Sequence, residues 1–258
     1  MIDAHNHLQD IRFNGMRKDI IQSMRQAGIT RCVVNGTRPS DWPEVAKLAT
    51  NHPDLIIPSF GLHPWHLAET QSPPNWLGQL KHLLDTTPSA CLGECGLDRA
   101  MADYDIDLQT EVFTTQLRLA ATRNLPISIH CVRAWGRLID ILESTPLPTR
   151  GFLLHSYGGS ADLIPRLVKL GAYFSFSGSI LHPHKQKARD TFTQVPANRL
   201  LIETDAPDMR PPEEVITHPL PDHLNHPANL PAIFKQAAPF LDISLIQRNF
   251  DKLFLIEE

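Results

Sequence analysis

The sequence has no apolar run that approaches the roughly 20 residues needed for a membrane-spanning helix. Its N-terminus also lacks a basic segment followed by an apolar one, which is the pattern of a secretion signal. These absences argue against a helical membrane protein and against export. We therefore expect a cytoplasmic protein without a membrane partner, and nothing in the sequence indicates an obligate protein partner.

Cysteine and positive charge are also scarce. The four cysteines, Cys32, Cys91, Cys95 and Cys131, form no CxxC pair and fall in or beside apolar segments, which predicts buried, reduced thiols. The formal net charge of −4 argues against a protein that wraps duplex nucleic acid, although it allows a local basic pocket for a phosphate.

What the chain does contain is a repeated alternation of short apolar strands with helical stripes. One such stripe comprises Leu108, Val112, Phe113, Leu117 and Ala120, and it ends at Asn124. Repeated about eight times, the alternation predicts a (β/α)8 TIM barrel that forms one domain over residues 1–258. A doubly wound open sheet is the alternative, but no GxGxxG or P-loop follows any strand. The predicted strands are Ile2–His5, Cys32–Asn35, Ile56–Gly61, Ala90–Glu94, Ile127–His130, Phe152–His155, Ala172–Ser175 and Leu200–Glu203.

Histidines and carboxylates stand at the C-terminal ends of most of these strands. His5 and His7 follow the first strand, and because residues i and i+2 share one face, their imidazoles could hold one metal ion. An isolated HxH could equally be a surface turn or the remnant of a purification tag. In a barrel, however, the strand ends together form the active site, which favours a metal site. The other candidates at strand ends are His63, Glu94, His130, His155 and Asp205.

Simpler interpretations of these residues stay open. Glu94 could form a buried ion pair with an arginine, and His63 could be a turn histidine bonded to the backbone. Asp205 could cap a helix, but proline-rich sequence follows it in place of a helical pattern. We expect six further histidines to be solvated loop residues: His66, His182, His184, His218, His223 and His226.

Taken in order, the motifs resemble those of the TatD-like metal-dependent hydrolases, a branch of the amidohydrolase-type barrels. The resemblance runs nearly end to end. Three features depart from the family pattern: Cys95 replaces an aliphatic residue, Arg99–Asp105 lacks an aromatic pair, and Arg133 stands one residue further from His130 than usual. The matching segments are DAHNH at 3–7, GLHP at 61–64, GECGLD at 93–98, HCVRA at 130–134, HSYGGS at 155–160, SFSG at 175–178, ETDAP at 203–207 and NHP at 225–227.

The resemblance implies a site with two divalent metal ions. By that resemblance His5 and His7 hold one ion together with Asp205, while His130 and His155 complete the second site. Glu94 bridges the two. It also implies a deoxyribonuclease that acts on single-stranded DNA as a 3'-5' exonuclease.

Such a site would use metal-activated water. Nitrogen and oxygen ligands suit Zn, Mn, Fe, Co or Ni, and Mg less well, so the sequence leaves the metal's identity open. Two ions about 3.5–4 Å apart would clamp the attacking and leaving oxygens at phosphorus and lower the pKa of the attacking water from about 15.7 toward roughly 7. Asp205 is then the best candidate for the general base, and Glu94 for the bridge.

Substrate contacts are expected from His63 and from Arg133. Trp65 or Trp135 could stack a base, and the proline-rich segment Pro207–Pro231 cannot form a helix and is predicted to be a lid over the barrel mouth. The loop cations that could neutralise the phosphates of a short single strand are Arg99, Arg133, Arg137, Lys185, Lys187, Arg189 and Arg210.

Three functions are compatible with these patterns. The first is a nuclease that acts on single-stranded DNA or another phosphate-bearing substrate. The second is a metal-dependent ester or amide hydrolase, such as a deacylase of misacylated tRNA, which would use the same ligands. The third is a non-catalytic metal-binding protein, which predicts the loss of Glu94 or Asp205, and both are present. The sequence leaves the substrate, the polarity of exonuclease action and the oligomeric state open.

Overall fold

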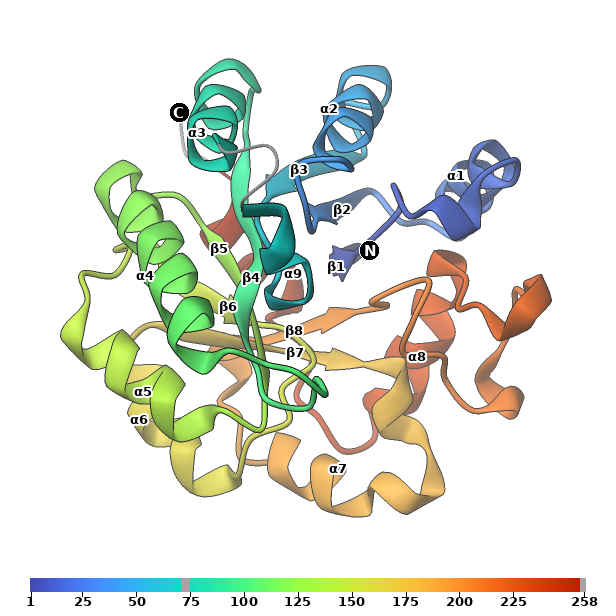
Figure 1. Cartoon of the computed structure of the whole chain (residues 1–258). Helices are drawn as coiled ribbons and strands as arrows, with labels where there is room; N and C mark the ends of the chain where they lie inside the picture. The colour runs from blue at the N-terminus through green and yellow to red at the C-terminus, as the bar shows by residue number, and fades with distance from the viewer. Residues whose placement is uncertain (71–74, 256–258) are drawn as a thin grey trace.

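The computed structural model describes residues 1–70 and 75–255. Its eight strands form one parallel sheet in which every strand pairs with the next one along the chain. The strands lie at the centre of the molecule and the helices surround them (Figure 1). Their bounds are β1 Ile2–Asn6, β2 Arg31–Gly36, β3 Ile56–Phe60, β4 Cys91–Asp98, β5 Ile127–Val132, β6 Phe152–Leu154, β7 Ala172–Ser177 and β8 Leu200–Glu203.

The first and last strands close the sheet into a barrel. The Asp205 N–H donates to the His5 carbonyl at 2.9 Å, and the His7 N–H donates to the Ala206 carbonyl at 2.7 Å. The buried Asp3 carboxylate accepts hydrogen bonds from the Thr204 N–H at 2.9 Å and from its hydroxyl at 2.6 Å. Because an open sheet would leave these two edges apart, the predicted barrel is confirmed and the doubly wound alternative is excluded.

The predicted stripe from Leu108 to Ala120 forms the longest helix, α4. The Asp105 side chain caps the first turn of α4 by accepting hydrogen bonds from the Asp107 and Leu108 N–H groups, both at 3.0 Å. The helix ends at Asn124, whose φ of 49° is left-handed. The helices are α1 Arg17–Gln26, α2 Trp42–Asn51, α3 Trp76–Thr86, α4 Ile106–Arg123, α5 Trp135–Ser144, α6 Ile164–Lys169, α7 Gln186–Phe192, α8 Leu230–Ala237 and α9 Ile246–Phe254.

The strands are buried on both faces, which explains their continuous apolar sequences. One face fills the barrel interior and the other packs on the helices, so that Val33, Phe152 and Phe174 are fully buried. Each such side chain contributes roughly 1.5–3 kcal/mol of hydrophobic stabilisation. Within the described residues, no helix is long and apolar enough to cross a membrane.

Of the predicted strands only β8 has its exact bounds, and the others differ by one or two residues at an end, apart from the C-terminal end of β4. β4 continues to Asp98, four residues beyond its expected end. The segment Pro207–Pro231 contains only three-residue 3₁₀ turns up to Asn229, as its prolines predicted, but α8 already begins at Leu230. Proline is tolerated there because the first turn of a helix has no intrahelical acceptor for its N–H.

Candidate metal centre

The two N-terminal histidines are held by their outer ring nitrogens. His7 Nδ1 donates to the Asn35 carbonyl on β2 at 2.8 Å, and His5 Nδ1 is hydrogen-bonded to the Ser128 hydroxyl on β5 at 2.8 Å. Both Nε2 atoms therefore point into the barrel mouth, where they lie 3.3 Å apart. Fixing one imidazole nitrogen in this way is how proteins orient the other toward a metal ion.

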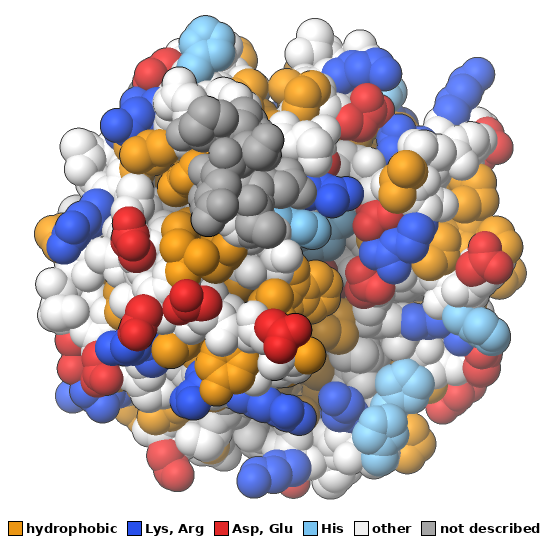
Figure 2. Space-filling view, in the orientation of Figure 1, with side chains coloured by type: hydrophobic (Ala, Val, Ile, Leu, Met, Phe, Trp, Pro, Cys, Tyr) orange, Lys and Arg blue, Asp and Glu red, His pale blue; other side chains and the backbone are white. Residues whose placement is uncertain are grey.

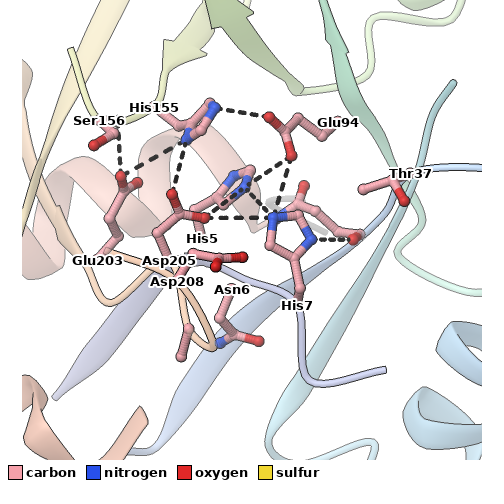
Figure 3. A network of polar contacts seen from close by, with 12 residues as sticks. His5, Asn6, His7, Thr37, Glu94, His155, Ser156, Glu203, Asp205 and Asp208 are labelled. Atoms are coloured by element: carbon pink, nitrogen blue, oxygen red, sulfur yellow. Dashed lines mark hydrogen bonds and ion pairs between the residues drawn. The ribbon is translucent and has the colours of Figure 1, made fainter. Parts of the chain in front are cut away.

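Two carboxylates face this pair of nitrogens. Glu94 Oε2 lies 3.5 Å from His5 Nε2 and 3.2 Å from His7 Nε2. Asp205 Oδ1 lies 3.7 Å and 3.4 Å from the same two atoms, as Figure 3 shows. Four ligand atoms placed tetrahedrally around an ion at about 2.1 Å would be separated by roughly 3.4 Å. The spacing of the ligand atoms of His5, His7 and Asp205 therefore fits a metal ion, and Glu94 Oε2 lies beside both imidazole nitrogens.

The second oxygen of Glu94 faces a different group of histidines. Glu94 Oε1 lies 2.8 Å from His155 Nε2 and 3.0 Å from His130 Nδ1. The two imidazole nitrogens are themselves 3.2 Å apart. One carboxylate thus stands between two sets of imidazoles, with one oxygen directed at each, which is the arrangement that a bridging ligand requires. No arginine contacts Glu94 among the described residues, so the ion-pair interpretation is wrong.

His63 lies beside the same oxygen but differs in its hydrogen bonding. Its Nε2 is 3.2 Å from Glu94 Oε1, while its Nδ1 accepts a hydrogen bond from the Trp65 N–H at 3.1 Å. Burial lowers the pKa of His63 to about 4, although Glu94 opposes this shift. The neutral ring then carries its proton on Nε2 and can donate it in a hydrogen bond at this site, although its position with Glu94 and His130 also fits a metal ligand.

Burial and mutual attraction set the charges of the cluster. Burial alone would raise the pKa of Glu94, but the surrounding imidazoles, His155 and His63 foremost, hold it well below its usual range. The same holds for Asp205, where His7 provides the largest opposing effect. Burial likewise tends to lower the pKa of His7, yet its hydrogen bonds to the two carboxylates raise it. The carboxylates of this centre are therefore held ionised by the imidazoles around them.

Three buried side-chain atoms have no hydrogen-bond partner in the described part of the chain, and one of them, His155 Nδ1, lies at this centre. His155 Nδ1 lies 3.8 Å from Glu203 Oε1 and 3.9 Å from Asp205 Oδ2, too far for a hydrogen bond. Thiolates take no part, since the Cys95 thiol lies toward the Ser128 carbonyl at 3.9 Å. Nitrogen and oxygen donors of this kind fit borderline divalent ions.

Two acidic residues without a predicted role, Asp98 and Glu203, support the cluster. Asp98 accepts hydrogen bonds from His130 Nε2 at 3.0 Å and from Trp65 Nε1 at 2.7 Å. Burial would raise the pKa of Asp98, but these hydrogen bonds more than offset it and hold the pKa at about 2. Glu203 accepts from the Ser156 N–H at 2.7 Å and from the Ser175 hydroxyl. The sequence motifs could have identified both residues as site candidates, because each stands at the end of a strand.

The helix-cap interpretation of Asp205 is also wrong. Asp205 follows β8 directly with a left-handed φ of 50°, and its carbonyl accepts the Asp208 N–H at 2.9 Å in a turn. The next helical element is the 3₁₀ turn at Glu213–Val215. The Asp205 side chain is thereby left to face the histidines.

The loop cations are less concentrated on the mouth than predicted. Arg137 pairs with Asp107 at 2.8 Å and Arg210 pairs with Glu213 at 2.5 Å. Arg189 donates to backbone carbonyls at 2.6–3.2 Å and is therefore structural. Figure 2 shows histidine side chains in a hollow in the middle of one face, with basic side chains at its border.

Arg133 is exposed directly after β5 and has no acidic partner among the described residues. The prediction that His226 is solvated is wrong: it is 5% exposed, and its Nδ1 accepts the Ala228 N–H at 2.9 Å.

Comparison with known proteins identifies the family of this chain. The family model described as TatD related DNase matches residues 2–252. The chain belongs to this family. A curated relative from Erwinia tasmaniensis, named 3'-5' ssDNA/RNA exonuclease TatD, is 32% identical over 92% of this chain and 91% of its own. The metal-dependent hydrolase YjjV of Escherichia coli is 34% identical over 81% of this chain and 80% of its own.

Solved structures of TatD-family proteins share the fold. The crystal structure of YjjV from Escherichia coli has a TM-score of 0.88 and 29% identity, and covers 100% of this chain and 98% of that one. A TatD family hydrolase from Entamoeba histolytica, at 17% identity, has a TM-score of 0.82 over 99% of this chain and 98% of its own.

Proposed function

We propose that this protein is a metal-dependent hydrolase that removes nucleotides from the 3' end of single-stranded nucleic acid. The observation that carries the proposal is the position of Glu94, whose two oxygens face two separate groups of imidazoles. The names of relatives such as the Erwinia tasmaniensis exonuclease support the choice of substrate.

In this proposal His5, His7 and Asp205 hold one divalent ion. His130 and His155 would hold a second one, and Glu94 would offer one oxygen to each group. Bound there, the ions would supply an activated water and neutralise the charge that develops on the phosphoryl group. Hydrogen bonds from the outer nitrogens of His7 and His130 to Asn35 and Asp98 keep the inner nitrogens directed at the ions.

The protein's own groups then move the protons and hold the substrate. Asp205 is ionised and 5% exposed, so it can accept a proton from the attacking water at neutral pH. His63 carries a proton on Nε2 and can donate a hydrogen bond to a substrate oxygen. Arg133, exposed at the end of β5, can pair with a phosphate of the incoming strand.

The first test combines metal content with activity. We expect about two equivalents of metal after loading, measured by mass spectrometry, and shortening of a single-stranded oligonucleotide from its 3' end. Asp205→Asn should lower kcat by roughly 10²–10⁴-fold, because it removes the base. Asp140→Asn on the outer side of α5 is the control and should keep full activity.

Two results would contradict the proposal. One is unchanged hydrolysis by Asp205→Asn, and the other is no more than trace metal after loading. An aminoacyl ester assayed in parallel distinguishes the deacylase alternative, which requires faster hydrolysis of the ester than of the oligonucleotide.

A further inference from the structure

Trp65 is the most exposed aromatic side chain near the candidate metal centre. It follows the His63–Pro64 turn after β3 and is 59% exposed, whereas Trp42 is 1% exposed. A single exposed aromatic ring is ordinary on a protein surface, so a binding role for Trp65 depends on how the ring is held and on what lies beside it.

The orientation of this indole is fixed by a buried carboxylate. Trp65 Nε1 donates to Asp98 Oδ2 at 2.7 Å, and the Asp98 residue is 2% exposed. The Trp65 backbone N–H donates to His63 Nδ1 at 3.1 Å. Two hydrogen bonds thus hold the residue at the mouth, and Asp98 is shared with His130.

No described aromatic ring stacks in parallel on the indole. The His63 ring lies 4.8 Å from it at an interplanar angle of 79°, and the His130 ring lies 6.1 Å away at 70°. Both contacts are edge-to-face. The indole is therefore directly beside the candidate ligands while most of its surface is open to solvent.

Cations and a second aromatic ring lie on the neighbouring strand ends. The Arg99 N–H donates to the Val132 carbonyl at 2.9 Å, which brings the loop after β4 next to Arg133 after β5. The Arg99 guanidinium lies 5.4 Å from the centre of the Tyr104 ring. Proteins that bind single strands combine cations that follow the backbone with aromatic rings that stack the bases.

We propose that Trp65 is the stacking platform for an unpaired nucleobase next to the scissile phosphodiester. The inference rests on the proposed function and adds the selection of single-stranded ends. A base inside a duplex is stacked on both faces and would have to leave the duplex to stack on the indole, which costs stacking and pairing energy. Asp98 acts as a positioning residue, because it fixes the indole relative to His130.

The test compares Trp65→Leu with Trp65→Phe on two oligonucleotides. One is an ordinary single strand, and the other carries abasic tetrahydrofuran units at its last two positions. Trp65→Leu should raise KM for the ordinary strand by roughly 5- to 150-fold, the range for one base stack, with kcat within about twofold. Trp65→Phe keeps a ring and should recover most of the affinity. On the abasic strand the wild type and Trp65→Leu should have equal KM values.

Direct binding separates this inference from the proposed function. Fluorescence anisotropy of a labelled oligonucleotide on the metal-loaded proteins should show the same loss for Trp65→Leu. Equal KM and equal binding of wild type and Trp65→Leu, or equal losses on both strands, would overturn the stacking role even if cleavage is observed. If binding depends on Trp65 but no cleavage occurs, the proposed exonuclease function is wrong and the stacking role of Trp65 stands. Neither cleavage nor binding by the wild type would overturn both.

Discussion

At the scale of single residues, the hydrogen-bond partner of Nδ1 decides whether the Nε2 of a histidine is free to bind a metal ion or carries a proton. His7 Nδ1 donates to the Asn35 carbonyl, which leaves its Nε2 for a metal ion. His63 Nδ1 accepts from the Trp65 N–H, which places the proton on its Nε2. The sequence predicted that both histidines belong to the site. It could not assign these different roles, since each depends on a partner that the fold supplies.

His226 illustrates the same dependence away from the metal centre. It is buried, and its Nδ1 caps the 3₁₀ turn Pro227–Asn229 by accepting the Ala228 N–H. The His218 ring lies 5.2 Å away, and both histidines line a cavity of about 360 Å³ together with Asp19 of α1. Burial, and secondarily the charge of His218, lower the pKa of His226 to about 4.

We therefore expect part of the protein's stability to be lost in mild acid. Because the folded pKa lies below the unfolded value of 6.5, this contribution is complete above pH 6.5 and disappears as the pH falls toward 4. From pH 6.5 to 5 the free energy of unfolding should fall by about 1.5 kcal/mol through this group. Urea unfolding of wild type and His226→Asn between pH 6.5 and 5 measures this loss of stability, because asparagine keeps a cap acceptor and does not titrate. Identical pH dependence of the two proteins would show that His226 is not responsible.

At the scale of elements, β4 contributes two acidic residues to the site, whereas its predicted bounds included only Glu94. Glu94 and Asp98 both lie on it, and its register pairs Gly96 with His130 of β5. The apolar run predicted the start of this strand within one residue. Its extension to Asp98 depends on hydrogen bonds to β5, which a local pattern does not contain.

Gly96 is the residue that allows this close pairing. Its φ is +149°, and a Cβ at this position would lie 2.0 Å from the His130 carbonyl oxygen. Gly96→Ala should therefore destabilise the protein by more than about 2 kcal/mol, through the clash and the backbone strain together.

Gly136→Ala is the matched control for Gly96→Ala. A Cβ there has nothing within 4 Å, and alanine in a helix is preferred over glycine by up to about 1 kcal/mol. Thermal denaturation of both variants measures the difference. Equal stability of the two variants would contradict the close approach of β4 and β5.

At the scale of the whole molecule, the barrel brings together residues that are far apart in the sequence. His5 and Asp205 lie on opposite sides of the closure between β1 and β8, where backbone hydrogen bonds join the two strand ends. Glu94 lies on β4, far from both residues in the sequence, and its Oε2 is still only 3.5 Å from His5 Nε2. A metal ion bound here would connect strands across the barrel.

Metal binding should therefore stabilise the entire fold. An ion present at about 100 times its Kd adds roughly 2.7 kcal/mol to the free energy of unfolding. For a chain of this size we expect Tm to fall by about 5–10 °C when the ion is removed with a chelator. Differential scanning fluorimetry with and without chelator, and after addition of Zn²⁺ or Mn²⁺, measures the change.

His7→Ala serves as the control for metal binding because it removes a candidate ligand. Its Tm should respond less to the chelator than that of the wild type. If the Tm of the wild type does not respond to chelator or added metal, the cluster does not hold an ion that is linked to folding.

The sequence by itself determined the alternation of strands and helices, the residues at the strand ends and the family to which the chain belongs. These features depend on local apolar periodicity and on short motifs, which can be read along the chain. The barrel over the described residues followed from the repetition of the pattern, while the single domain over 1–258 stays a prediction.

Only the tertiary structure decided how the strand-end residues divide their roles. It placed Glu94 between two groups of imidazoles, directed Asp98 at both His130 and Trp65, and buried His226. The physical reason is that ligand spacing, burial and the partner of each ring nitrogen arise from contacts between strands. Such contacts exist only once the barrel has closed.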